Sequence, residues 1–217
     1  YKAFTTKDLT GAVTGIRALG IRGCGVSMPF KEACIALVDE LDASAQAIAS
    51  INTIVNTDGH LKAYNTDYIA IAQLLQTHQV PKDTTFALLG SGGMAKAVAS
   101  ALRDGGYRNG MVVARNELTG PALATSCGYS WQAQLGAHRP QMLINVSPVG
   151  MAGGAEADDL AFEEDAVDSA EIVFDVVAIP VETPLIKRGR AQGKQVITGL
   201  EVIAIQAVEQ FVLYTGV

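Results

Sequence analysis

TFALLGSGGMAKAVASAL, residues 85–102, decides how the rest of the chain is organised. It opens with an unbroken apolar run, Phe86–Leu89, which predicts a strand buried on both faces, and its alanine-rich part predicts a helix. The turn between them has the spacing G-x-G-x-x-A at Gly90, Gly92 and Ala95. In that setting the first helical N–H groups can bind a pyrophosphate. The stretch therefore predicts a dinucleotide-binding unit, with a plain strand-to-helix turn as the alternative.

Strand patterns alternate with helical patterns through the second half of the chain. Apolar runs that predict further strands occupy residues 111–114, 142–146, 172–176 and 196–198, and a closing helix is expected at 200–214. Strands separated by helices predict a doubly wound parallel sheet, which binds its ligands at the carboxyl ends of the strands.

The first part of the chain has a different pattern. Two strands at 52–56 and 61–65 flank an Asp-Gly turn and predict a hairpin, and helices are expected at 5–19, 32–43 and 68–75. We therefore expect an α/β protein with two domains. The polar joint at residues 80–83 marks the expected boundary: a first domain of mixed α/β structure would span residues 1–80, and a Rossmann-like domain would span 81–199.

The residues after the predicted strand at 111–114 indicate which dinucleotide is bound. An acidic residue there would bond the ribose 2′-hydroxyl of NAD, but the chain has Ala114-Arg115-Asn116. A guanidinium suits a 2′-phosphate, so NADP is the expected cofactor. Two alternatives stay open: Arg115 could point into solvent, and Glu117 keeps NAD possible.

Composition excludes several functional classes. The chain has 217 residues, 49% of them hydrophobic, and a net charge of −6, which argues against binding to nucleic acids or to anionic membranes. Apolar runs are too short for a membrane span, so a cytoplasmic protein is expected. Three scattered histidines and three cysteines without a C-x-x-C pair predict neither a metal site nor a disulfide framework. Because the chain opens at Tyr1, we expect that an upstream segment is missing.

Six motifs, in order, resemble those of the shikimate dehydrogenase family. They lie at residues 25–31, 51–53, 63–67, 90–97 and 145–151, and at Gln206. The resemblance implies an NADP-dependent oxidoreductase that interconverts 3-dehydroshikimate and shikimate in the chorismate pathway of aromatic amino acid biosynthesis. The order of the motifs implies that the domain at residues 1–80 is the substrate-binding catalytic domain and that residues 200–217 complete it.

The resemblance also implies roles for individual residues. Lys31 would be the catalytic acid/base and Asp67 its catalytic partner, although an Asp before a helix is more often an N-cap. Hydride addition to a ketone leaves negative charge on oxygen, which an ammonium group can neutralise and protonate. Substrate contacts are expected from Ser27, Lys31, Asn52, Asp67 and Gln206.

By the same resemblance, a second group of residues would bind the cofactor. These are Gly90, Ser91, Gly92, Gly93, Met94, Ala95, Arg115, Asn116, Ser147, Met151, Val176 and Gly199. Gly199 is expected beside the nicotinamide, where a missing side chain would let the ring approach.

Four departures from the family pattern bear on activity. The family's serine pair for the substrate carboxylate belongs to the missing upstream segment, Ala178 replaces a tyrosine, Ala63 replaces a glycine, and no basic residue follows Arg115 closely. These differences predict a paralogue with weakened activity or a shifted substrate. The alternatives are a quinate/shikimate dehydrogenase that uses NAD or NADP, and a non-catalytic dinucleotide-binding regulator. A monomer or homodimer with a small hydroxylated ring carboxylate as substrate is expected, without nucleic-acid or membrane partners.

Overall fold

The structure of the protein is a computed structural model that describes residues 2–27 and 29–217. Tyr1, at which the predicted first domain opens, and Met28, inside the motif at 25–31, lie outside the described residues. Every other residue of the predicted sites lies within them. The expected α/β fold class is confirmed: one sheet has four strands and includes antiparallel pairs, and the other has six parallel strands.

The chain divides into two compact units. One contains Tyr1–Ile69 and Gln206–Val217, and the other contains Ala70–Ile205. The divisions fall inside helices α3 (Thr66–Thr77) and α8 (Gly199–Thr215), whereas the expected domain boundaries lie near residues 80 and 200. The difference arises because both helices continue without a break through the positions where the packing changes.

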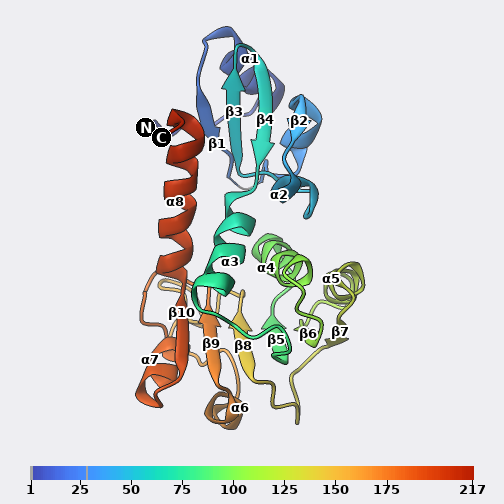
Figure 1. Ribbon diagram of the computed structural model, residues 1–217, viewed down its shortest axis with the longest axis vertical. Helices are drawn as coiled ribbons and strands as arrows, with labels where there is room; N and C mark the ends of the chain where they lie inside the picture. The colour runs from blue at the N-terminus through green and yellow to red at the C-terminus, as the bar shows by residue number, and fades with distance from the viewer. Residues whose placement is uncertain (1, 28) are drawn as a thin grey trace. The chain divides into compact units, whose positions relative to one another are not determined.

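The sheet of the first unit has the strand order β1-β3-β4-β2 (Figure 1). Its strands, in that order, are Gly23–Gly25, Thr53–Thr57, His60–Tyr64 and Glu40–Leu41. β3 and β4 are antiparallel, so the predicted hairpin is confirmed. Its turn residues Asp58 and Gly59 have φ values of 51° and 90°, a left-handed pair that matches the twist of the two strands.

The prediction of one helix at residues 32–43 is wrong. That segment forms a 3₁₀ helix, Ala33–Leu37, followed by β2 and the short helix α2, Ala43–Gln46. Bonds to β4 override the helical pattern: the Asp39 carboxylate accepts from Leu61 N at 2.7 Å, and Asp42 N donates to the Ala63 carbonyl at 2.8 Å. The chain is thereby drawn out beside β4.

Helix α1, Leu9–Ala18, begins later than the expected residue 5. The side chain of Asp8 accepts a hydrogen bond from Gly11 N and caps the helix at that point. The buried side chains of α1, Val13 and Ile16, join a core with Ile51, Ile54 and Leu61 from the first unit.

The sheet of the second unit has the strand order β10-β9-β8-β5-β6-β7, and all neighbouring strands are parallel. Its strands, in chain order, are β5 Phe86–Leu89, β6 Gly110–Val113, β7 Ser130–Gln132, β8 Met142–Asn145, β9 Ile172–Asp175 and β10 Gln195–Thr198. Five of them were expected. The sequence analysis missed β7, which is short, lies at the sheet edge and begins and ends with polar residues. The chain reverses its direction of winding between β5 and β8, which is where such sheets bind ligands.

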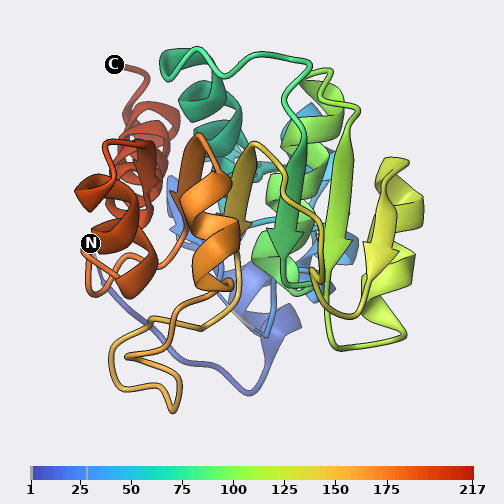
Figure 2. The same ribbon diagram turned by 90° about the horizontal axis from the view of Figure 1, so that it is seen from below.

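Helices cover both faces of this sheet. On one face, α6 (Glu164–Ser169) and α7 (Pro184–Ala191) pack on alternate residues of the strands, among them Ala87, Leu143 and Val173. Helix α4 (Gly93–Asp104) lies on the other face, and α5 (Thr119–Cys127) packs against β6 and β7 (Figure 2). Strands covered on both faces carry apolar residues throughout, which is why their positions could be predicted from the sequence.

The end of α8 is held against β1 within the first unit. Arg22 Nε donates to the Tyr214 carbonyl at 3.1 Å, and the ring of Tyr214 fills the space where a side chain at Gly23 would lie. The placement of Gln206 and Gln210 on α8 therefore depends on a glycine in β1.

We predict that Gly23→Ala lowers the free energy of unfolding by about 1–3 kcal/mol, because the new methyl group overlaps a packed ring. Chemical denaturation measures the change. The matched control is Gly15→Ala in α1, where the added carbon meets no described atom within 4 Å outside its own helix and helix propensity rises. Equal stability of the two variants would contradict the packing role of Gly23.

Candidate active site

The structure brings Lys31 and Asp67 together. Lys31 Nζ lies 2.9 Å from Asp67 Oδ2, although the two residues are 36 positions apart in the sequence. The Asp67 side chain is 7% exposed and that of Lys31 is 29% exposed. A buried carboxylate therefore holds an ammonium group that solvent, or a ligand, can still reach.

Backbone contacts fix both partners. Lys31 lies in the turn that follows β1, and its carbonyl accepts from Ile51 N at 2.9 Å. Asp67 lies in the first turn of α3, where the helix dipole favours a negative charge. The N-cap bond comes from Asn65, whose Oδ1 accepts from Tyr68 N at 3.0 Å. The alternative that Asp67 is the cap is therefore wrong, and its carboxylate is directed to Lys31.

Asn52 lies at the start of β3 and is 2% exposed. Its Oδ1 accepts from Thr66 N at 2.8 Å, from Thr66 Oγ1 at 3.1 Å and from Thr53 Oγ1 at 2.9 Å. These bonds fix the first residue of α3, which immediately precedes Asp67. No described residue accepts a hydrogen bond from Asn52 Nδ2. A buried amide donor without a partner costs about 1–3 kcal/mol, and such atoms call for an explanation.

The other predicted substrate residues lie in the first unit as well. Ser27 is exposed in the loop after β1, and Gln206 is half-buried on α8. One turn after Gln206, Gln210 donates from Nε2 to Thr53 Oγ1 at 3.0 Å and so joins the Asn52 cluster. The sequence analysis missed Gln210, although its spacing of four residues from Gln206 places both on one helix face.

The glycine turn of the second unit leaves backbone free for a ligand. Gly90 has φ of 125° and approaches Val146 so closely that a β-carbon would lie 3.1 Å from its carbonyl oxygen. At Gly92, the N-cap of α4, and at Gly93, a β-carbon would meet no atom within 4 Å from the described residues beyond the adjoining chain. The N-terminus of α4, with Met94 and Ala95 in its first turn, is therefore open to a phosphate.

Of the two expected cofactor residues that follow β6, one is exposed and the other is already hydrogen-bonded within the protein. Arg115 is 84% exposed and its nearest ion-pair partner is Glu156, 3.9 Å from Arg115 Nη1. Asn116 Oδ1 accepts from the backbone N atoms of Leu118 and Thr119, at 2.9 Å each. Ser91 Oγ lies 2.7 Å from Thr119 Oγ1, which joins the glycine turn to the start of α5.

A buried network joins the loops that follow β8 and β9. Asn145 Nδ2 donates to Asp175 Oδ1 at 3.0 Å, and Asp175 also accepts from Thr183 Oγ1 at 2.7 Å and Val177 N at 3.0 Å. Ser147 Oγ donates to Asn145 Oδ1 at 2.6 Å. Burial raises the pKa of Asp175 to about 6, and its hydrogen bonds oppose that rise. The sequence signal for Asp175 is an acidic residue at the end of an apolar strand.

Three further expected cofactor residues lie at the same edge of the sheet. Met151 is exposed, and Val176 N donates to the Asn145 carbonyl at 3.0 Å. At Gly199, a β-carbon would overlap the backbone of Val176 and Val177. A glycine at this position therefore lets the backbone of Val176 and Val177 approach closely, and the place of Gly199 beside the nicotinamide stays a prediction.

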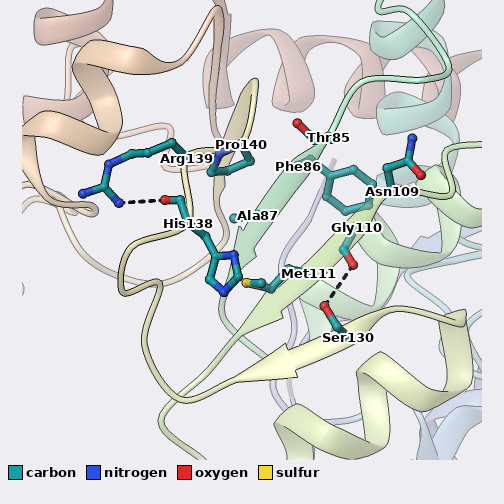
Figure 3. Close-up of a pocket in the computed structure, with 10 residues that line it drawn as sticks. All are labelled: Thr85, Phe86, Ala87, Asn109, Gly110, Met111, Ser130, His138, Arg139 and Pro140. Carbon is teal, nitrogen blue, oxygen red and sulfur yellow. Dashed lines mark hydrogen bonds between the residues drawn. The ribbon is translucent and has the colours of Figure 1, made fainter.

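A pocket of about 300 Å³ opens at the amino ends of β5 and β6. Figure 3 shows the imidazole of His138 directed toward Met111, while the guanidinium of Arg139 turns away and donates to the His138 carbonyl. Asn109 bonds the Asp83 carbonyl, and Ser130 bonds the Gly110 carbonyl. Because it lies at the amino ends of the strands, opposite the glycine turn, this pocket is a poor candidate for the cofactor site.

The described residues hold neither a metal-ligand cluster nor a membrane-spanning helix. Among residues 2–27 and 29–217, no three His, Cys, Asp or Glu side chains gather as metal ligands would. In the same residues, no helix combines the length and hydropathy needed to cross a membrane.

Comparison with known proteins gives matches over the whole chain. The family model described as the shikimate dehydrogenase substrate binding domain matches residues 1–54. A shikimate dehydrogenase-like protein of Haemophilus influenzae is 53% identical over 215 residues, which are 99% of this chain and 79% of that protein.

Solved structures match both units. Shikimate 5-dehydrogenase of Thermus thermophilus, in complex with NADP(H) and shikimate, has a TM-score of 0.85 and 29% identity over 99% of this chain and 80% of that one. Quinate dehydrogenase of Corynebacterium glutamicum, in complex with NAD, has a TM-score of 0.88 and is 27% identical in sequence. The match covers 100% of this chain and 80% of that one. The likeness covers the α/β fold of this chain in full.

The raised pKa of Asp175 predicts a pH-dependent stability. The unfolded chain loses this proton near pH 4 and the folded chain near pH 6, so the group's stabilising contribution is present at low pH and lost as pH rises through about 6. The free energy of unfolding of the wild type, minus that of Asp175→Asn, should fall by roughly 3 kcal/mol between pH 4 and 7. Denaturant titrations at each pH measure it.

Asp159→Asn, which removes an exposed carboxylate of the same unit, serves as the control. Its difference from the wild type should show no comparable fall. A difference between the wild type and Asp175→Asn that stays constant over this pH range would contradict the account of Asp175.

Proposed function

We propose that this chain, which belongs to the shikimate dehydrogenase family, is an NADP-dependent oxidoreductase that interconverts 3-dehydroshikimate and shikimate. The observation that carries the proposal is the contact between Lys31 Nζ and Asp67 Oδ2 at 2.9 Å. We further propose that the first unit binds the substrate and the second binds the cofactor. The open N-terminus of α4 in the second unit fits a dinucleotide phosphate.

Lys31 would transfer the proton to and from the ketone oxygen. Bound NADPH would supply a hydride to the ketone carbon, and the negative charge that would develop on the ketone oxygen requires a proton. Lys31 Nζ gives that proton and takes it back in the reverse direction. Asp67 keeps the ammonium group oriented and offsets its charge, since a carboxylate that is 7% exposed has few other ways to be satisfied.

The unpaired Nδ2 of Asn52 supports the proposal that the ligand carries hydroxyl groups. A ring hydroxyl could accept from Nδ2, while Oδ1 remains engaged with Thr66 and Thr53. Because Nδ2 is shielded from solvent, the hydroxyl reaches it only when a neighbouring side chain moves aside. Gln206 and Ser27 would hold other oxygens of the ring.

For the cofactor we propose NADP, held at the glycine turn by residues 90–95 and at its 2′-phosphate by Arg115. The T. thermophilus enzyme in complex with NADP(H) supports this choice. Asn116 would act indirectly, because its oxygen already holds the start of α5. Ser147, Met151, Val176 and Gly199 would form the nicotinamide end, with Ser147 fixed by its bond to Asn145.

We propose a paralogue with weakened activity or a shifted substrate. Ala178 stands where the family usually has a tyrosine, and one lost hydrogen bond to a charged group is worth about 1.5–3 kcal/mol, or roughly ten- to a hundredfold in rate. The quinate dehydrogenase among the similar structures makes quinate, with NAD or NADP, the second candidate. A regulator that binds dinucleotide without turnover is the third, although a lost catalytic function would leave the Lys31–Asp67 pair without a purpose.

We predict that Lys31→Ala lowers kcat for shikimate oxidation at least about 100-fold, because the proton donor is removed. NADPH affinity should stay unchanged, and fluorescence titration of NADPH checks it. Lys62→Ala is the matched control, since Lys62 pairs with Glu40 at the surface of the same unit, 2.7 Å away. Turnover by Lys31→Ala equal to that of the control would remove Lys31 from the mechanism.

Kinetics with shikimate and with quinate separate the candidate substrates. A higher kcat/KM for shikimate supports the first candidate, and a higher value for quinate supports the second. Calorimetry that shows NADPH binding by a protein that turns over neither acid would instead favour the regulator.

A further inference from the structure

The charge balance beside Arg115 bears on which dinucleotide is preferred. In a doubly wound sheet, the residues that follow the second strand read the adenosine ribose, and an arginine there accommodates a 2′-phosphate. Arg115 follows β6 and is 84% exposed, so its guanidinium is free to meet such a ligand. Its surroundings decide how strongly it does so.

The backbone donors next to Arg115 are already engaged. Asn116 Oδ1 accepts from Leu118 N and Thr119 N at 2.9 Å each, so the start of α5 does not present these N–H groups to a phosphate. The hydroxyl of Thr119 lies 2.7 Å from that of Ser91. A 2′-phosphate in this place would depend on the charge of Arg115.

A carboxylate competes for that charge. Glu156 Oε1 lies 3.9 Å from Arg115 Nη1, in the loop between β8 and α6. The backbone of Glu156 is anchored, because its carbonyl accepts from Gly150 N at 2.8 Å. Glu117, exposed two residues after Arg115, adds a second negative charge in the same segment.

The two dinucleotides respond to this carboxylate in opposite ways. A 2′-phosphate carries close to two negative charges, which Glu156 repels while it holds the guanidinium that should neutralise them. A ribose 2′-hydroxyl is neutral and can donate a hydrogen bond to a carboxylate, as in NAD-binding sites. Glu156 therefore weakens NADP binding and tolerates or assists NAD binding.

We propose that Glu156 is a specificity-determining residue that narrows the preference of this protein for NADP over NAD, by pairing with Arg115. The inference rests on the proposed function, because it assumes that the dinucleotide lies at the glycine turn. It assigns a role to a residue outside the motifs that identify the family.

The test is equilibrium binding of NADP⁺ and NAD⁺ to the wild type and to Glu156→Gln, measured by calorimetry without substrate. We expect the ratio of Kd for NAD⁺ to Kd for NADP⁺ to rise about 1.5- to fivefold in Glu156→Gln, the range of an exposed ion pair. The rise should shrink at high salt, because the charges are exposed. Glu163→Gln, which removes an equal charge from the same inter-strand segment, should leave the ratio unchanged.

A second variant distinguishes pairing with Arg115 from a general charge effect. In an Arg115→Ala background, Glu156→Gln should change the ratio less than it does in the wild type. An unchanged ratio in the single variant, or an equal change in both backgrounds, overturns the role of Glu156 and leaves the proposed reaction standing. If neither dinucleotide binds to the wild-type protein, the proposed function and this inference both fail.

Discussion

The amide of Asn52 is the constraint on which the candidate active site depends. Its oxygen accepts three hydrogen bonds and so fixes the start of α3, and the next residue along that helix carries the carboxylate that holds Lys31. Its nitrogen has no partner among the described residues. One side chain thus builds the site and leaves a donor for whatever the site binds.

In the second unit, too, buried polar side chains fix the backbone, here at the carboxyl edge of the sheet. Asn145 and Asp175 are fully buried, and they hold the loops after β8 and β9 through hydrogen bonds to Ser147, Val177 and Thr183. Loops of this kind have little apolar packing, so buried polar groups must define their shape. The cost is a carboxylate whose pKa is raised by burial, and stability is therefore coupled to pH at a proposed cofactor site.

The fold was predictable wherever local pattern and tertiary packing agree. Strands buried on both faces, such as Phe86–Leu89, and the hairpin at Asp58 and Gly59 follow from their residues alone. The prediction for residues 32–43 failed because hydrogen bonds of Asp39 and Asp42 with β4 override the helical pattern of this segment. The meeting of Lys31 with Asp67 was anticipated from the family resemblance, since no periodicity links residues so far apart. Gln210 was missed and Asp175 was given no role of its own, because what each does depends on partners that only the folded chain brings near.

The central claim is that Lys31, Asp67 and Asn52 form one site for a hydroxylated ring. A crystal structure of the protein with shikimate and NADP tests it most directly. The account predicts that Lys31 Nζ lies within hydrogen-bond distance, about 2.7–3.2 Å, of the ring oxygen that becomes the ketone, and that Asn52 Nδ2 donates to a ring hydroxyl. A shikimate molecule bound elsewhere, with the Lys31–Asp67 pair and Asn52 Nδ2 untouched, would contradict it.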